Sequence, residues 1–157
     1  MAKYDIENFL SDIETYFKAN LNTHIAAINT EKGDSLLSSV STGSYTIQSL
    51  DAGVVNQTPM ILIGVSNIES NTLANVNVKT YSVDIIIIIE KDSDFNNIKR
   101  LWRYQRAIED TVKAAYNSIL RSLRLKVESL VPVEVAINNK SQLQLAIGVG
   151  LLVELKN

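Results

Sequence analysis

The chain has 157 residues, 46% hydrophobic and 20% charged, with a formal net charge of −2 at pH 7. This composition suits one soluble globular domain over residues 1–157 with a core of its own. The absence of cysteine excludes disulfides, thiolate metal sites and cysteine nucleophiles. No apolar run reaches the roughly 20 residues of a membrane span, and the acidic start, MAKYDIENFLSDIE, does not resemble a signal peptide.

The first predicted element is an amphipathic helix. Asp5 is a good N-cap, Gly33 is a plausible stop, and acidic residues gather near the start, where the helix dipole favours them. The single histidine, His24, lies on or beside the apolar stripe, and we interpret it as a packing residue. The stripe recurs in steps of three and four at Ile6, Phe9, Leu10, Ile13, Phe17, Leu21, Ile25 and Ile28.

A turn-rich stretch follows over residues 30–58, in which residues 45–50 can form a short strand. Residues 60–65 predict a buried strand. The polar stretch from Ser66 to Val78 has four asparagines and predicts either a β-hairpin with a long tip or strands extended beyond the body as an arm. A merely floppy loop is the alternative.

Residues 81–90, YSVDIIIIIE, predict the central strand of a sheet. Tyr81, Val83 and Ile85 alternate with polar residues, which indicates one wet face. The five consecutive isoleucines that end the stretch indicate a strand covered on both faces there.

A second helix is predicted to follow, with Asp94 as its cap. Asp92 and Asp94 lack the glycine and later acids of a calcium loop, so capping is the favoured interpretation. Trp102 lies in the apolar stripe of this helix, and we interpret it as a core anchor. The stripe comprises Phe95, Ile98, Leu101, Trp102, Gln105, Ile108, Val112, Ala115, Ile119 and Leu123.

The same helix carries an exposed basic face. Residues 99–126 hold eight basic and two acidic residues, a net charge of +6, which leaves −8 for the rest of the chain. One interpretation is a solvated face balanced by acidic surface on the same molecule. The second is a pair of complementary surfaces that join neighbouring subunits. Nucleic-acid binding ranks third, because the helix lacks interleaved aromatic residues for stacking.

Two further strands are predicted, over residues 125–137 and 143–155. Pro132 removes one backbone donor and should therefore lie at an edge, bulge or bend. The small residues Ala146, Gly148 and Gly150 suggest that a helix or another subunit packs closely on the last strand. The predicted fold class is α+β, a single antiparallel or mixed sheet packed by two long helices, in the order α-β-β-β-α-β-β.

The sequence contains no motif for catalysis or for cofactor binding. Gly148 and Gly150 lie inside a strand and are not followed by a helix, so they do not form a nucleotide-binding fingerprint. There is no GxSxG nucleophile elbow, and one histidine cannot both ligate a metal and act as a base. We therefore expect no enzyme activity, no catalytic residues, no metal and no cofactor.

The order of these elements and their residue patterns resemble those of phage tail terminator and tail-completion proteins over most of the chain. The resemblance rests on the leading helix DIENFLSDIETYFKANL and on the irregular stretch that ends in TPMILIGV. It also rests on the hairpin into VKTYSVDIIIIIE, which runs at once into the helix DSDFNNIKRLWRYQRAIEDTVKAAY. The closing strands LKVESLVPVEVAI and QLQLAIGVGLLVEL complete it.

The resemblance implies a virion protein at the junction of tail and neck, assembled in the host cytoplasm. Such a protein forms a ring, commonly a hexamer, on the last ring of the tail tube and stops its growth. Its partners are then further copies of itself, the tube protein and, in some tails, sheath and neck proteins. DNA passes the channel without being read, and no membrane is involved.

Two sets of residues become candidate contacts under this resemblance. The first set, on the basic helix, is expected to meet a neighbouring subunit and comprises Lys99, Arg103, Arg106 and Lys113. The second, in the polar hairpin, is expected to meet the tube ring and comprises Asn67, Asn71, Asn75 and Asn77. The alternatives are another ring protein of the neck or baseplate and, in a different class, a small cytosolic ferredoxin-like domain that binds a ligand or is an enzyme.

Overall fold

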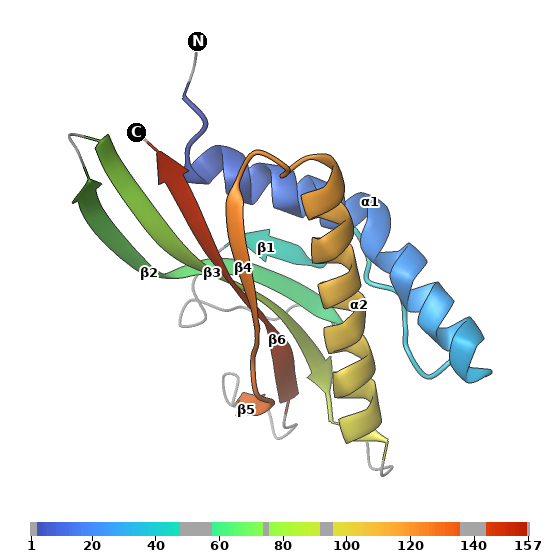
Figure 1. Cartoon of the computed structure of the whole chain (residues 1–157). Helices are drawn as coiled ribbons and strands as arrows, with labels where there is room; N and C mark the ends of the chain where they lie inside the picture. The colour runs from blue at the N-terminus through green and yellow to red at the C-terminus, as the bar shows by residue number, and fades with distance from the viewer. Residues whose placement is uncertain (1–2, 48–57, 74–75, 92–95, 136–143, 157) are drawn as a thin grey trace.

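The structure, a computed structural model, describes residues 3–47, 58–73, 76–91, 96–135 and 144–156. Two helices pack against one face of a mixed sheet (Figure 1), which confirms the predicted α+β class. In chain order the elements are α1 (Ile6–Lys32), β1 (Tyr45–Ile47), β2 (Met60–Leu73), β3 (Val76–Glu90), α2 (Asn97–Ser118), β4 (Arg124–Ser129), β5 (Val133–Val135) and β6 (Gln144–Lys156).

Helix α1 begins and ends where the sequence predicts. The Asp5 carboxylate accepts from the Asn8 backbone N–H and the Asn8 side chain accepts from the Asp5 backbone N–H, each at 3.0 Å, which forms a capping box. Gly33 closes the helix at φ 69°, a left-handed conformation that glycine adopts without a steric penalty. Six members of the predicted stripe are buried, namely Phe9, Ile13, Phe17, Leu21, Ile25 and Ile28, and the other two, Ile6 and Leu10, are partly buried.

The sheet order is β1-β2-β3-β6-β4, with β5 also paired to β6. β1 runs parallel to β2, and the other pairs are antiparallel. The isoleucine run of β3 lies at the centre and is buried on both faces, as predicted. Ile85, Ile87 and Ile89 face the helices, while Ile86 and Ile88 face the opposite side with Ala146, where Leu130 packs against them.

The polar stretch after Val65 is strand rather than loop. β2 and β3 remain paired from Met60 with Ile88 to Leu73 with Val76, with one bulge between Val65 and Asn67. Of the two hairpin forms that the sequence predicts, the structure has the extended arm, which projects beyond the helices (Figure 1).

The segment that follows α1 is tied down by side chains that sequence patterns did not single out. Asn29 and Asn22 each exchange two amide hydrogen bonds with the backbone, at Leu37 and Val40 respectively. The buried Tyr104 hydroxyl accepts from the Ser38 N–H and donates to the Ser38 carbonyl, both at 2.9 Å. The first part of the turn-rich stretch is therefore anchored to both helices, and residues 48–57 lie outside the described chain.

Helix α2 is shorter than its apolar stripe predicts. It ends at Ser118, and the buried Leu120 turns the chain toward β4, so Leu123 lies beyond the helix. At its start the N-cap residue is Asn96, whose side chain makes no capping hydrogen bond. The predicted cap Asp94, with Asp92 and Phe95, falls outside the described residues.

The predicted strand over residues 125–137 is divided into β4 and β5, with Pro132 between them at the sheet edge, as predicted. The expectation that a helix packs closely on the small residues of β6 is wrong at Gly148. A β-carbon at Gly148 would collide with the Ile85 carbonyl oxygen and lie 2.8 Å from the Ile86 Cα. What packs closely at Gly148 is the backbone of the neighbouring strand β3 rather than a helix, and contact with another subunit stays a prediction.

Candidate interaction surface

Two of the four residues predicted to meet a neighbouring subunit are engaged within the chain. Arg106 donates two hydrogen bonds to the Glu31 carboxylate, at 2.7 and 3.0 Å, and lies 3.8 Å from Asp110. Arg103 donates to both oxygens of Asp34 at 2.9 Å. These pairs join α2 to the C-terminal end of α1, which is the balanced surface that the first interpretation of the charge pattern expects.

The ion pairs shift the pKa of both carboxyl groups downward. Hydrogen bonds from Arg106, aided by its charge, lower the pKa of Glu31 to about 2. The hydrogen bond from Arg103 is the main cause that lowers the pKa of Asp34, and the Leu36 backbone N–H adds to it. Both groups are exposed, so solvent screening limits what these pairs contribute to stability.

The two lysines of the set differ from the arginines in their ion pairing. Lys99 and Lys113 are exposed, and neither forms an ion pair with any described residue. Arg121 and Arg124 lie beyond the end of α2, and Arg124 is 3.7 Å from Glu154 of β6. The basic face therefore offers two lysines for an external partner, while its central arginines bind the chain itself.

The asparagines of the polar hairpin lie on the arm. Asn67, Asn71 and Asn77 are exposed there, and Asn75 lies outside the described residues. Pairing in the ladder puts Asn67 and Asn71 on the face of the sheet opposite the helices, while Asn77 accepts a hydrogen bond from Thr72 at 3.1 Å. Their role in binding the tube ring remains a prediction.

The prediction that Trp102 is a core anchor is wrong. Its side chain is 62% exposed, and Ile98, one turn earlier, is 59% exposed. The residues of α2 that bury are one step round the helix, at Leu101, Tyr104 and Ile108. The predicted stripe is wide enough to include both sides, because it covers the core-facing residues and those that flank the open sheet edge.

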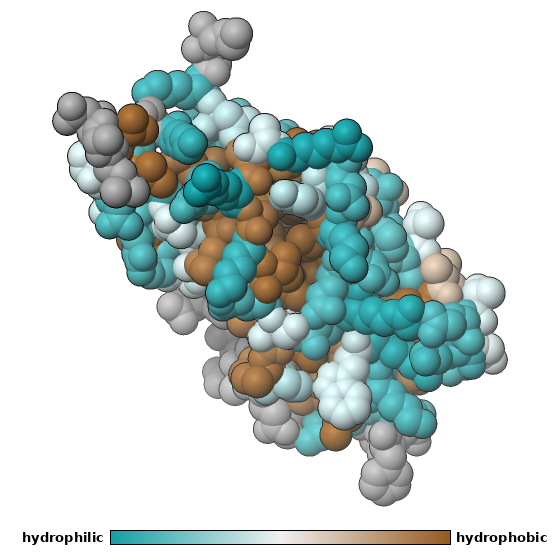
Figure 2. All heavy atoms as spheres, viewed as in Figure 1, coloured by the Kyte–Doolittle hydropathy of each residue, from teal (hydrophilic) through white to brown (hydrophobic). Residues whose placement is uncertain are grey.

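Trp102 belongs to an apolar strip along that edge. In the described chain eleven large hydrophobic side chains are exposed, and seven of them lie on this flank of α2 or on the β4–β5 edge beside it. Figure 2 shows hydrophobic side chains gathered between β4 and α2 and framed by hydrophilic ones. We call this the edge strip; its members are Ile98, Trp102, Tyr116, Ile119, Val127, Val131 and Val133.

Two side-chain contacts hold α2 against this edge. The Gln105 amide donates to the Leu130 and Gly148 carbonyls, both at 2.8 Å, where β4 gives way to β5. Ser129 donates to Glu109 at 2.8 Å. Gln105 is a polar member of the predicted apolar stripe, and it satisfies two backbone acceptors at the break in the edge.

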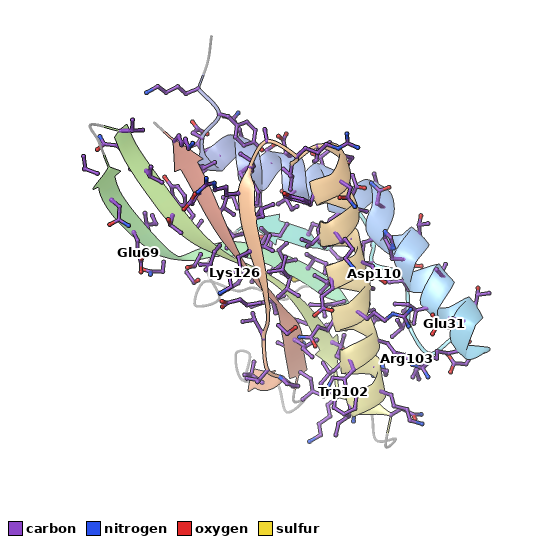
Figure 3. All side chains as sticks on the ribbon, viewed as in Figure 1. Glu31, Glu69, Trp102, Arg103, Asp110 and Lys126 are labelled. Carbon is purple, nitrogen blue, oxygen red and sulfur yellow. The ribbon has the colours of Figure 1, made fainter. Side chains whose placement is uncertain are left out.

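A groove of about 410 Å³ opens between α2 and β4. It is lined by Val112 and Leu125, by the exposed Tyr116 and Val127 of the edge strip, and by Lys113, which forms no ion pair with a described residue. Asp110, labelled on α2 in Figure 3, also lines the groove. An open apolar groove next to a sheet edge is suited to a strand or a protein side chain.

Features of other classes of site are lacking in the described part of the chain. It has no group of three or more His, Cys, Asp or Glu residues that could hold a metal ion. Neither helix is long and apolar enough to cross a membrane. The prominent surface feature of the described residues is therefore the edge strip with its groove.

Comparison with known proteins does not place the chain in a family: no family model and no curated protein matches it.

Proposed function

We propose that this protein is a structural subunit that assembles with copies of itself into a ring, and that the ring is a phage tail terminator. The observation that supports self-assembly is the edge strip. Among the described residues, seven exposed large hydrophobic side chains on the flank of α2 and the neighbouring β4–β5 edge form an apolar surface of the kind that protein partners bury. The terminator role rests on the sequence resemblance.

The proposed mechanism is mechanical and uses no catalytic group. The ring docks on the last ring of the tail tube and leaves the tube protein no free surface on which to add. Its opposite side receives the neck, and DNA passes through the central channel. A contact between two different surfaces of neighbouring subunits closes into a ring when its rotation allows closure.

The first test is the mass of the purified protein in solution, together with negative-stain images at high concentration. We expect annular particles at high concentration. A strict monomer at every concentration would overturn the proposal. A ring that leaves the polymerisation of its cognate tube protein unaffected would overturn the terminator role and favour another connector of the neck or baseplate.

A second test replaces two members of the edge strip by a polar residue. The double variant Trp102→Ser with Val131→Ser should lower the association constant by on the order of a hundredfold, because loss of two apolar anchors costs roughly 2–4 kcal/mol. Its unfolding free energy should change by less than about 1 kcal/mol, since both residues are exposed. Ala27→Ser on the exposed side of α1 serves as the control. Equal association of variant and control would exclude the edge strip as the contact.

A further inference from the structure

Within the described chain the outer sides of β1, β4 and β5 are unpaired, and so is that of the arm portion of β2. β1 and β5 are only 3 residues long, so β4 and the arm portion of β2 are the longer free edges. The arm portion is free because β1 pairs only with Ile61, Leu62 and Ile63, which leaves residues 64–73 with β3 on one side alone. Backbone groups along such edges can accept a strand from another molecule.

We propose that β4 of one copy pairs antiparallel with the arm portion of β2 in the next copy, so that one sheet continues from subunit to subunit. The proposal rests on the self-assembly of the proposed function but does not depend on the tail. The strand directions agree with this proposal. β2, β3, β6 and β4 alternate in direction across the sheet, so β4 is antiparallel to β2. A second β2 beside β4 therefore extends the alternation, and corresponding faces stay on the same side.

The lengths of the unpaired edges of β4 and β2 favour one alignment of the two strands. β4 runs from Arg124 to Ser129, and β1 blocks β2 up to Ile63. Centring β4 on residues 64–73 sets Val127 opposite Ile68 and Lys126 opposite Glu69. In this register β4 spans residues 66–71 of the neighbour, and the break at Pro132 lies near Ile63, where the pairing of that neighbour's β1 with β2 ends.

On the helix side this register buries two exposed apolar side chains against each other. Ile68 is 56% exposed and Val127 is 46% exposed. They share the helix-facing side of the sheet, because Ile68 pairs with Tyr81 and Val127 with Leu151, both members of the helix-side core. Ile68 of the next copy then enters the groove lined by Val127 and Tyr116.

On the opposite face the charges are complementary. The outward side chains of β4 are Arg124, Lys126 and Glu128, a net charge of +1, and the matching face of the arm carries Glu69. Lys126 lies 3.1 Å from Glu128 within its own chain and would gain Glu69 as a second partner. Figure 3 shows Glu69 and Lys126 on their separate strands, with β3 and β6 between them in the sheet.

One neighbouring register is poorer. Moving β4 by two residues so that Glu128 stands opposite Glu69 places like charges directly opposite one another, which is unfavourable. Moving it by two residues the other way sets Arg124 opposite Glu69 and Leu125 opposite Ile68, and the cross-linking test below distinguishes that register from the proposed one. A lysine on an edge strand commonly discourages pairing with other chains. In the proposed contact Glu69 stands opposite Lys126 and offsets this effect. A strand without an acidic residue at that position would not, so the contact is selective for a second copy of this chain.

The test uses the lack of cysteine in the chain. Ile68→Cys and Val127→Cys are made in separate chains, one of them carrying a mass tag, then mixed under mild oxidation and run on a non-reducing gel. Within one chain the two positions are three strands apart, about 14 Å at the usual strand spacing. A disulfide needs Cα atoms within roughly 7 Å. Every cross-link therefore reports a contact between copies.

We expect a tagged–untagged dimer from the mixture and no dimer from either variant alone. Ser70→Cys mixed with Val127→Cys is the register control, because diagonal positions stand about 7–8 Å apart and should cross-link far less. A dimer from Val127→Cys alone would mean that two β4 edges pair with each other, which overturns the proposal. A chain that carries both Ile68→Cys and Val127→Cys should give a series of cross-linked oligomers on the gel, and the largest should have the number of subunits in the ring.

The outcomes separate this inference from the proposed function. Rings that form without the cross-link overturn the edge pairing and leave the ring proposal intact. A series of cross-linked oligomers that continues without an upper limit supports the edge pairing and overturns closure into a ring.

Charge reversal provides an independent measurement. Lys126→Glu or Glu69→Lys alone should weaken association by on the order of fivefold, and mixing the two reversed chains should restore association. Equal weakening in the mixture would contradict the Lys126–Glu69 contact.

Discussion

Two glycines of β6 illustrate how single residues act differently on one strand. Gly148 lies against the backbone of β3, where a β-carbon would collide with the Ile85 carbonyl oxygen. At Gly150 a β-carbon would meet the Asp84 carboxylate oxygen at 3.5 Å and a Leu130 methyl group at 3.6 Å, which are ordinary contacts. Gly148 is therefore required for the approach of two strands, and Gly150 is not.

Gly148→Ala should lower the free energy of unfolding by about 1–3 kcal/mol or more, because the strands must move apart to admit the methyl group. Urea denaturation measures this change. Gly150→Ala is the matched control and should stay within about 0.5 kcal/mol of the parent chain. Equal effects at both positions would show that the close approach of β3 is not what selects glycine at position 148.

At the scale of elements, α1 and α2 are joined by charge as well as by their apolar faces. The Glu31–Arg106 and Asp34–Arg103 pairs lie at the open end of the helix pair, and the Tyr104 hydroxyl holds the Ser38 backbone nearby. Burial is the main cause that raises the pKa of Tyr104. The hydrophobic faces supply most of the attraction, and the polar contacts fix the position of the segment that follows α1.

The Glu31–Arg106 pair should make stability depend on pH. The pKa of Glu31 is lowered from 4.5 to about 2 in the folded chain, so its contribution is present above pH 4.5 and is lost as the pH falls toward 2. Glu31→Gln should therefore unfold at a slightly lower temperature than the parent at pH 7. The difference should vanish near pH 2, as followed by circular dichroism. A difference that is constant from pH 7 to 2 would show that the ion pair is not its source.

For the molecule as a whole, the structure divides the basic face of α2 into an internal and an external part. Arg103 and Arg106 neutralise acids of α1, whereas Lys99 and Lys113 have no ion pair among the described residues. Reversing the two arginines would therefore disturb the helix pair together with any assembly, and such a variant cannot report on a subunit contact alone. The lysines are the informative positions.

Lys99→Glu with Lys113→Glu should weaken self-association by on the order of tenfold, and more at low salt, because exposed charges steer and orient the contact. Its denaturation midpoint at a concentration where the chain is monomeric should fall less than that of the arginine variant, because Lys99 acts on Asp34 only through its charge. Arg103→Glu with Arg106→Glu should lower both the midpoint and association. Sedimentation velocity and urea denaturation separate the two. If the lysine variant assembles like the parent, the lysines lie outside the contact.

The sequence by itself determined the elements that depend on local periodicity and local chemistry. The helix from Asp5 to Gly33, the isoleucine strand buried on both faces and the α+β class all follow from spacing, caps and β-branched residues. Tertiary structure alone decided where the sheet ends. Trp102 lies in an apolar stripe like Leu101, yet one borders the open edge and the other is buried, since exposure depends on neighbours that periodicity does not encode. For the same reason only the structure brings the arm edge, the β4 edge and the groove into view as surfaces that a second copy can join.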